Sequence, residues 1–272
     1  MARRAIGIDI GGTGIKGALV NVKKGVLVGE RVRFETPAGG RPEDIAKVVR
    51  QLIDDISGTH SYTSVGICFP AVVQHGTTMS AANVSQEWIG LDAAKLFTEA
   101  LGRHVHVVND ADAAGIAEVK FGAAKRRKGL VLMTTLGTGI GTALFIDGKL
   151  VPNAELGHLE IDGVDYETKA SYAAKEREDL SWDDWAERLQ KYYGKLEALF
   201  SPDLIIVGGG VSKNHQNFLP KLKLRAEIVP ALKRNNAGIL GAAWLAADRS
   251  SNEKPRGNDG GDPAADMVIL SA

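Results

Sequence analysis

The sequence contains a single cysteine, which excludes two common ways of stabilising a fold. Cys68 has no partner for an intrachain disulfide, and one thiol does not make a cysteine-based zinc site. No apolar run approaches the roughly 20 residues that a membrane span needs. The apolar stretch after Arg3 and Arg4 is short and broken by glycines, unlike a signal peptide. We therefore expect a soluble, cytoplasmic protein without a membrane partner.

The chain also lacks an excess of charge of either sign. Its 272 residues include 33 basic and 33 acidic ones, so no overall field attracts nucleic acid or a membrane surface. A chain of this length buries a substantial core and is expected to form two domains rather than one. We expect no nucleic-acid partner.

The common nucleotide-binding motifs are missing too. No G-x-x-x-x-G-K-[ST] sequence occurs, which excludes a P-loop protein, and the H-R-D and D-F-G motifs of protein kinases are absent. GTGIKG at residues 12–17 matches the dinucleotide fingerprint G-x-G-x-x-G, but that fingerprint needs a helix directly after the turn. Here the turn leads into ALVNVKKGVLV, which has the composition of a strand. A Rossmann dinucleotide site is therefore not expected.

What the sequence does contain is a repeated glycine motif. GTGIKGAL at residues 12–19 recurs as GTGIGTAL at residues 137–144, with six of eight positions identical. Each copy stands between two apolar runs, which predicts strand, tight turn and strand near the start of each half. Such turns leave backbone N–H groups free to converge on an anion. Two of them predict one polyanionic ligand held from both sides of a cleft, with ordinary hairpins as the alternative.

The apolar patterns predict an α/β chain with two similar halves. Strands are expected at 4–10, 17–22, 25–35, 64–69, 104–108, 129–135, 142–147, 203–208 and 225–229. Helices are expected at 43–56, 92–101, 111–121, 181–200, 213–222 and 237–248. Gly102 is predicted to end the second helix and Ser181 to cap the fourth.

The boundary between the halves is expected near residue 110, directly after the strand HVHVV. This gives a smaller N-terminal domain, 1–110, and a larger C-terminal domain, 111–248, whose last helix, 237–248, is expected to pack back on the first domain. Residues 249–272 are rich in Ser, Asn, Pro, Gly and Asp and are expected to form a disordered tail.

Several segments carry a resemblance to a known family. DIGGTGIKG (9–17), LGTGIGTALF (136–145), AELGH (154–158) and GGGVSK (208–213) resemble the ROK family of sugar kinases and repressors. Within it, GTGIKG together with NVSQEWIG (83–90) and RNNAGILGAA (234–243) is similar to the polyphosphate glucokinases of actinobacteria. The resemblance runs from about residue 4 to residue 247. It implies the actin-like, ribonuclease-H-like fold, with a cleft between two domains.

The resemblance also implies an activity: phosphoryl transfer from inorganic polyphosphate or ATP to the 6-hydroxyl of glucose or mannose, with Mg²⁺ as cofactor. It leaves the preferred sugar and donor open, and it favours a homodimer. The alternative is a sugar-sensing regulator without catalysis, which in this family carries a DNA-binding domain before the kinase-like part. Asp9 stands only eight residues after Met1, so we expect the kinase.

Asn109 and Asp110 end a predicted strand at the domain boundary, where open α/β folds bind ligands. A sugar hydroxyl that attacks a phosphoryl group needs a carboxylate to accept its proton, and the resemblance assigns this role to Asp110. The residues alone leave a second possibility, in which Asp110 or Asp112 caps helix 111–121.

The donor side is predicted from the glycine-rich turns. Asp9 ends the first strand, where a carboxylate suits Mg²⁺, directly or through water. Lys16 offers a charge to the phosphates, or is only a solvated lysine. The residues predicted to hold phosphate or nucleotide are Gly11, Gly12, Thr13, Gly14, Lys16, Gly137, Thr138, Gly139, Gly208, Gly209 and Gly210. For the last three glycines, a turn required only by the fold is the alternative.

On the sugar side, the resemblance implies that Glu155 and His158 bind adjacent hydroxyls, together with Asn83 and Asn109. Family members continue from this histidine into a cysteine-rich zinc loop and a further sugar-binding glutamate. Here the continuation is LEIDGVDYETKAS, which has no cysteine, so no zinc is expected. Glu167 is predicted as the last sugar ligand, with Glu160 as its competitor.

A basic run closes the set of candidates. Lys125, Arg126, Arg127 and Lys128 are consecutive, and further cations are scattered at Lys213, Lys221, Lys223, Arg225, Lys233 and Arg234. In a neutral protein that binds a long polyanion, the run predicts either a groove for polyphosphate or only a solvated loop.

Overall fold

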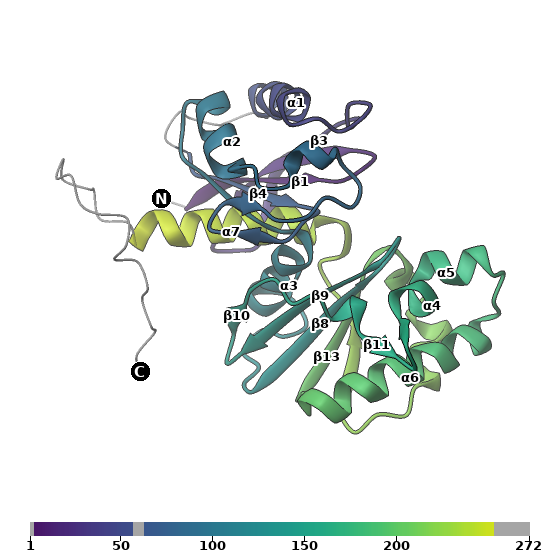
Figure 1. Cartoon of the computed structure of the whole chain (residues 1–272). Helices are drawn as coiled ribbons and strands as arrows, with labels where there is room; N and C mark the ends of the chain where they lie inside the picture. The colour runs from purple at the N-terminus through teal and green to yellow at the C-terminus, as the bar shows by residue number, and fades with distance from the viewer. Residues whose placement is uncertain (1–2, 57–62, 253–272) are drawn as a thin grey trace.

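The computed structural model describes residues 3–56 and 63–252, which form two five-stranded sheets of the same topology (Figure 1). The first has the order β3-β2-β1-β4-β7, and the second the order β10-β9-β8-β13-β14. In each sheet three strands form an antiparallel meander, and the two that follow lie parallel to the first strand of the meander or to each other. The duplication predicted from the repeated glycine motif is thus a duplication of whole sheets.

The strand bounds follow the apolar runs closely. The first sheet contains β1 (Arg4–Ile10), β2 (Ile15–Asn21), β3 (Val26–Phe34), β4 (Val65–Phe69) and β7 (Val105–Asn109). The second contains β8 (Leu130–Leu136), β9 (Ile140–Ile146), β10 (Lys149–Val151), β13 (Leu204–Gly208) and β14 (Glu227–Pro230). Two short hairpins, β5 (Val73–Gln74) with β6 (Thr77–Thr78) and β11 (Glu160–Ile161) with β12 (Val164–Asp165), were not predicted.

Helices cover both faces of each sheet. α1 (Pro42–Asp55) and α2 (Ala93–Leu101) cover one face of the first sheet, and α7 (Ala237–Asn252) covers the other (Figure 1). On the second sheet, α6 (Trp182–Phe200) buries Trp185, Tyr192 and Tyr193 against one face, while α3 (Asp110–Phe121) lies on the other. Short helices α4 (Glu167–Ala170) and α5 (Tyr172–Arg177) precede α6. We call residues 3–56 and 63–109 the N-terminal lobe and residues 122–236 the C-terminal lobe.

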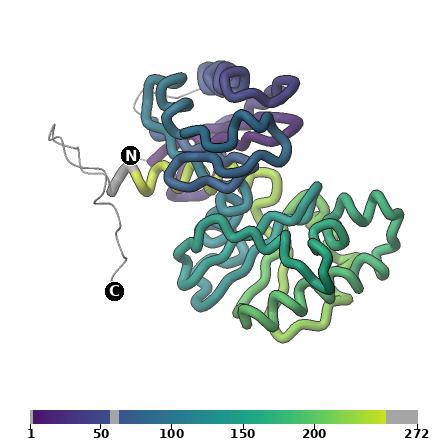
Figure 2. The backbone as a smooth tube through the Cα atoms, in the orientation of Figure 1, coloured from purple at the N-terminus to yellow at the C-terminus, as the bar shows by residue number. Residues whose placement is uncertain are grey.

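α3 and α7 cross between the lobes, so that α7 lies against β1 (Figure 2). Glycines allow this close approach. A Cβ atom at Gly7 would lie 1.9 Å from the carbonyl oxygen of Ile239, and one at Gly241 would lie 1.8 Å from that of Ala113. Because no side chain fits there, the backbones of β1, α7 and α3 lie in direct contact, and this contact joins the lobes.

Two expectations about helices need correction. The helix predicted at 213–222 is instead a pair of 3-10 segments, η3 (Gly210–Asn217) and η4 (Leu219–Lys221). Asn214 departs from helical dihedrals, and Pro220 has no N–H to continue a helical ladder. α7 runs to Asn252, past the predicted end at 248, and the rest of the predicted tail lies outside the described residues. None of the described helices is long and apolar enough to cross a membrane.

Candidate active site

A cavity of about 600 Å³ opens between the lobes at the carboxyl ends of β7, β8 and β13. The N-terminal lobe contributes residues 70–72 and 80–83, and the C-terminal lobe contributes the second glycine turn and the loop after β10. Of the residues predicted from the sequence, those that line this cavity are Asn83, Asn109, Asp110, Gly137, Thr138, Gly139, Glu155, His158, Glu167 and Gly209. The whole predicted sugar set is therefore brought together.

A second, smaller cavity of about 200 Å³ lies beside the first. It is lined by Asp9 and Lys16 from the N-terminal lobe, by Gly208 and Gly209, and by Arg234 from η5 (Arg234–Asn236). Asp110, Thr135 and Gly209 line both cavities. The carboxylate of Asp110 is thus placed between a space lined by the predicted sugar ligands and a space lined by predicted phosphate ligands.

Some predicted phosphate ligands line neither cavity: Gly11, Gly12, Thr13, Gly14 and Gly210. The first glycine turn is closed by a hydrogen bond of 3.0 Å from the N–H of Gly11 to the carbonyl oxygen of Gly14. A Cβ at Gly12 would lie 3.1 Å from the Cβ of Asn83. The turn therefore lies against the loop that carries Asn83, at the edge of the larger cavity.

Asp110 is the first residue of α3, but it does not cap the helix. The Asn109 Oδ1 accepts the N–H of Asp112 at 3.0 Å, and the Asn109 Nδ2 donates to the carbonyl oxygen of Ala71 at 3.0 Å. The alternative in which Asp110 or Asp112 is the cap is therefore wrong, because Asn109 takes that position. Burial, reinforced by the nearby Asp9 carboxylate, raises the pKa of Asp110 to about 6.

Asp9 is a half-buried carboxylate near the end of β1. Its Oδ1 accepts a weak hydrogen bond of 3.5 Å from the thiol of Cys68, and desolvation raises its pKa while Lys16 and Arg31 lower it. Nowhere in residues 3–56 and 63–252 do three or more His, Cys, Asp or Glu side chains gather as a metal site. Mg²⁺ is usually held by one or two carboxylates with substrate phosphates and water. Asp9, facing the smaller cavity, fits that pattern.

His158, in η2 (Leu156–His158), is held by a partner that the sequence did not reveal. Its Nδ1 lies 2.8 Å from Oδ2 of Asp165, the last residue of β12. This contact is the main reason that the pKa of His158 is raised, and Glu167 and Glu155 add to it. Burial raises the pKa of Glu155, while the nearby His158 lowers it.

The structure separates the two candidates for the last glutamate. Glu167 begins α4, and its Oε2 accepts the N–H of Ile140 at 2.6 Å, directly after the second glycine turn. A Cβ at Gly139 would lie 2.4 Å from the same oxygen, so a larger residue there would displace the Glu167 carboxylate. Glu160 is exposed on β11 and lines neither cavity.

With this geometry in place, comparison with known proteins places the chain in a family. Residues 5–176, more than half of the chain, match the ROK family. The chain belongs to the ROK family. It is 41% identical over 242 residues to a polyphosphate glucokinase of Mycobacterium tuberculosis, an alignment that covers 89% of this chain and 90% of that protein. The polyphosphate glucokinase of Mycobacterium leprae is 40% identical over 88% of this chain and 74% of its own length.

Solved structures of the ROK family share the fold. The crystal structure of the inorganic polyphosphate/ATP-glucomannokinase of Arthrobacter sp. strain KM is 54% identical, with a TM-score of 0.86 over 90% of this chain and 99% of that one. A ROK glucokinase of Streptomyces griseus, solved with glucose and AMPPNP, superposes with a TM-score of 0.78 over 90% of this chain and 99% of its own at 24% identity. The predicted actin-like fold and the predicted family are both confirmed.

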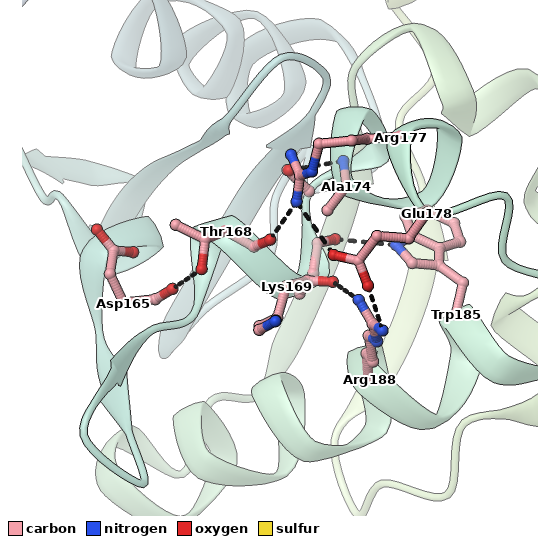
Figure 3. Close-up of polar contacts among 10 residues, drawn as sticks. Asp165, Thr168, Lys169, Ala174, Arg177, Glu178, Trp185 and Arg188 are labelled. Atoms are coloured by element: carbon pink, nitrogen blue, oxygen red, sulfur yellow. Dashed lines mark hydrogen bonds and ion pairs between the residues drawn. The ribbon is translucent and has the colours of Figure 1, made fainter.

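In this ROK-family chain the segment from Asp165 to α6 is held by ion pairs around Glu178 (Figure 3). Glu178 accepts from Arg188 at 2.6 Å and from Arg177 at 3.2 Å, and these contacts lower its pKa. Both guanidinium groups also bind backbone carbonyls of α4. The hydrogen bonds that fix this segment run from Arg177 to Thr168, from Arg188 to Lys169, from Trp185 to Ala170 and from the Thr168 hydroxyl to the Asp165 carbonyl. α4, whose first residue Glu167 lines the larger cavity, is therefore held in place by these hydrogen bonds.

The basic run lies away from both cavities. Lys125, Arg126, Arg127 and Lys128 follow the carboxyl end of α3, whereas Asp110 is at its amino end, and a 12-residue helix is about 18 Å long. All four side chains are exposed, and Arg127 forms an ion pair with Glu227. Among the scattered cations, Arg234 lines the smaller cavity, while Lys221 and Arg225 form ion pairs with Asp183 and Glu197.

Proposed function

We propose that this ROK-family protein transfers a phosphoryl group from inorganic polyphosphate or ATP to the 6-hydroxyl of glucose, and of mannose as a second acceptor. The proposal is supported by its likeness to polyphosphate glucokinases and to a polyphosphate/ATP-glucomannokinase. The single observation that carries it is the position of Asp110, which lines both the larger and the smaller cavity.

The larger cavity is the proposed sugar site. Asn83, Asn109, Glu155, His158 and Glu167 all line it and present amide, carboxylate and imidazole groups. Sugar hydroxyls both donate and accept hydrogen bonds, so a mixture of acceptors and donors on one wall is what a hexose requires. Much of the set is held by backbone or side-chain contacts of its own, which reduces the entropy lost when the sugar binds.

The smaller cavity is the proposed place of the donor phosphates. Lys16 and Arg234 supply positive charge, and Gly208 and Gly209 allow the backbone to approach closely. Asp9 is the residue that would hold Mg²⁺, directly or through water. The ion supplies neutralisation of the charge that develops on the transferred phosphoryl group.

Asp110 is the proposed general base. With a pKa of about 6, its carboxylate is mostly ionised near neutral pH and can accept a proton. As the O6–P bond forms and the bond to the leaving phosphate breaks, the proton of the 6-hydroxyl passes to Asp110. The rest of catalysis is positioning and electrostatics, as is usual for phosphoryl transfer, so closure of the lobes around both substrates is part of the proposal.

The decisive experiment replaces Asp110→Asn, which keeps the shape of the side chain and removes the base. We expect kcat to fall by at least ~10²-fold with glucose affinity changed only a few-fold. Initial rates with glucose and mannose, each against ATP and polyphosphate, establish the substrates of the parent protein. Sugar binding without any transfer in the unaltered protein would instead support the sugar-sensing regulator. Near-normal turnover of the variant would show that Asp110 is not the general base.

The homodimer and the cytoplasmic location remain predictions.

A further inference from the structure

The hairpin β11–β12 ends in a carboxylate that contacts two proposed sugar ligands at once. Asp165 Oδ2 lies 2.8 Å from Nδ1 of His158, and Asp165 Oδ1 accepts the backbone N–H of Glu167 at 3.1 Å. Asp165 itself does not line the cavity, whereas His158 and Glu167 do. Asp165 therefore contacts two residues that line the larger cavity without lining that cavity itself.

We propose that Asp165 is a positioning residue of the sugar site. It holds the imidazole of His158 with Nδ1–H toward the hairpin and Nε2 toward the cavity. It also holds the first residue of α4, Glu167, by accepting its backbone N–H. The inference rests on the proposed function, because it takes the larger cavity to be the sugar site.

The chemistry of the contact fixes the tautomer. An ionised carboxylate only accepts hydrogen bonds, so Nδ1 of His158 must carry the proton that joins it to Asp165. In the neutral ring Nε2 then has a lone pair and accepts from a sugar hydroxyl. Without Asp165 the ring is free to place its proton on Nε2, which would present a donor to the same hydroxyl.

The contact serves orientation more than stability. The side chains of His158 and Asp165 are 57% and 42% exposed, and ion pairs at such exposure contribute little to the free energy of folding. The charged groups around the ring are Asp165, Glu167 and Glu155, and all three favour the imidazolium form, while partial burial opposes it. A change at Asp165 can thus alter the orientation of the His158 ring with little effect on the free energy of folding.

The second contact of Asp165 extends the effect to the second glycine turn, which lines the same larger cavity. Glu167, whose N–H is held by Asp165, uses its own Oε2 to accept the N–H of Ile140 beside Gly139. A chain of hydrogen bonds thus runs from His158 through Asp165 and Glu167 to the second glycine turn. The hairpin around it does not depend on the carboxylate, because β11 pairs with β12 and the Asp165 carbonyl accepts from Thr168 (Figure 3).

Asp165→Asn is the variant that tests the proposal, since it keeps the size of the side chain. An amide has one oxygen that accepts and one NH2 group that only donates, so the two contacts cannot both keep their donor–acceptor direction: one is lost or reversed. Asp162→Asn is the matched control: Asp162 is in the turn of the same hairpin, forms an ion pair with Lys191, and lines neither cavity.

The first readout is the ¹⁵N NMR signal of the His158 ring, assigned by its loss in His158→Gln. We expect the Nδ1–H tautomer in the parent protein, and a shift toward Nε2–H with a lower pKa in Asp165→Asn but not in Asp162→Asn. This readout needs no catalysis, so it stands or fails separately from the proposed kinase activity. If Asp165→Asn does not fold, the tautomer of the parent protein at high pH decides: Nε2–H there overturns the proposal.

The second readout is a double-mutant cycle on glucose kinetics. We expect Asp165→Asn to raise KM for glucose about 10-fold with KM for ATP nearly unchanged, and to add little when His158→Gln is already present, because coupled residues are not additive. An unchanged tautomer and pKa in Asp165→Asn, or full additivity with His158→Gln, would overturn the assignment of Asp165 as a positioning residue.

Discussion

The side chain of Asn153 forms two hydrogen bonds with the backbone of Val73, although the two residues belong to different lobes. The N–H of Val73 donates to Asn153 Oδ1 at 2.9 Å, and Asn153 Nδ2 donates to the carbonyl oxygen of Val73 at 2.8 Å. The backbone N–H of Asn153 in turn donates to Oδ2 of Asp112 on α3 at 2.9 Å. We call Asp112, Asn153 and Val73 the lobe clasp. It joins β5, the loop after β10 and α3 next to the proposed sugar site.

Removing the clasp should loosen the lobes. In Asn153→Ala both side-chain hydrogen bonds are lost, each contributing roughly 0.5–1.5 kcal/mol, so we expect a lower melting temperature and a several-fold higher KM for glucose. The residue has φ of +58°, which Asn and Gly tolerate better than Ala. Asn153→Gly is therefore the control, because it removes the hydrogen bonds without the backbone strain. If Asn153→Gly leaves glucose KM unchanged, the clasp has no role in the sugar site.

The raised pKa of Asp112 predicts how the free energy of unfolding depends on pH. It is buried, its Oδ1 has no hydrogen-bond partner within the described parts of the chain, and burial, with Glu155 and Asp110 nearby, raises its pKa from 3.8 to about 7. Between these values the folded protein keeps a proton that the unfolded chain releases, so stability falls as pH rises through this window. Asp112→Asn mimics the protonated form and should remove this loss.

The measurement is urea unfolding of the parent protein and of Asp112→Asn at about pH 5 and about pH 8. One pKa unit corresponds to about 1.4 kcal/mol. We therefore expect the free energy of unfolding of Asp112→Asn, relative to that of the parent, to be higher at pH 8 than at pH 5 by on the order of 2 kcal/mol. The exposed Asp162→Asn should show no such divergence. A variant that loses stability equally at both pH values would show that Asp112 is ionised in the folded state.

The elements that the sequence predicted well are those set by local signals. The apolar runs around both glycine turns became β1, β2, β8 and β9, Gly102 ends α2 with φ of +63°, and Ser181 caps α6. These features depend on neighbours within a few residues. The sugar set was predicted because the family resemblance supplied it, and the structure brings that set to one cavity.

The residues that were missed act through contacts that no local pattern encodes. Asn153 meets Val73 across 80 positions of sequence, and Asp112 meets Asn153 across 41. Asp165 reaches His158 only because a six-residue stretch, 160–165, folds into β11 and β12, and each of these two-residue strands is too short to show an alternating pattern. The helix predicted at 213–222 was wrong for a local reason, because Pro220 has no N–H to continue a helical ladder and the segment forms 3-10 turns instead.

Glu167 and Glu160 offer a direct comparison of two similar residues. Because Glu167 lines the cavity and accepts from Ile140, Glu167→Gln should raise KM for glucose by about 10-fold, consistent with the loss of a charge-assisted hydrogen bond. Glu160→Gln should leave both KM and kcat within two-fold (roughly the range of surface changes). Initial rates under matched glucose and ATP concentrations check this. The reverse pattern would make Glu160 the sugar ligand in the closed enzyme.

The last prediction concerns the path of a long polyphosphate. The run from Lys125 to Lys128 lies at the far end of α3 from Asp110, which favours the solvated loop over the groove. Lys213, by contrast, is exposed on η3, four residues after Gly209, and takes part in none of the ion pairs of the described residues. We expect Lys213→Gln to raise KM for long polyphosphate several-fold with KM for ATP nearly unchanged, and the triple change of Lys125, Arg126 and Lys128 to Gln to affect neither.

Salt dependence gives the physical reason and the check. A long polyanion meets several cations and releases counterions when it binds, as nucleic acids do, whereas ATP presents three phosphates to the smaller cavity. KM for polyphosphate should therefore climb more steeply with salt than KM for ATP, since exposed contacts are screened over ~10 Å at 0.1 M. In Lys213→Gln this slope should become shallower. If instead the triple variant flattens the slope and Lys213→Gln does not, polyphosphate follows the outer end of α3, and the groove that the basic run first suggested is real.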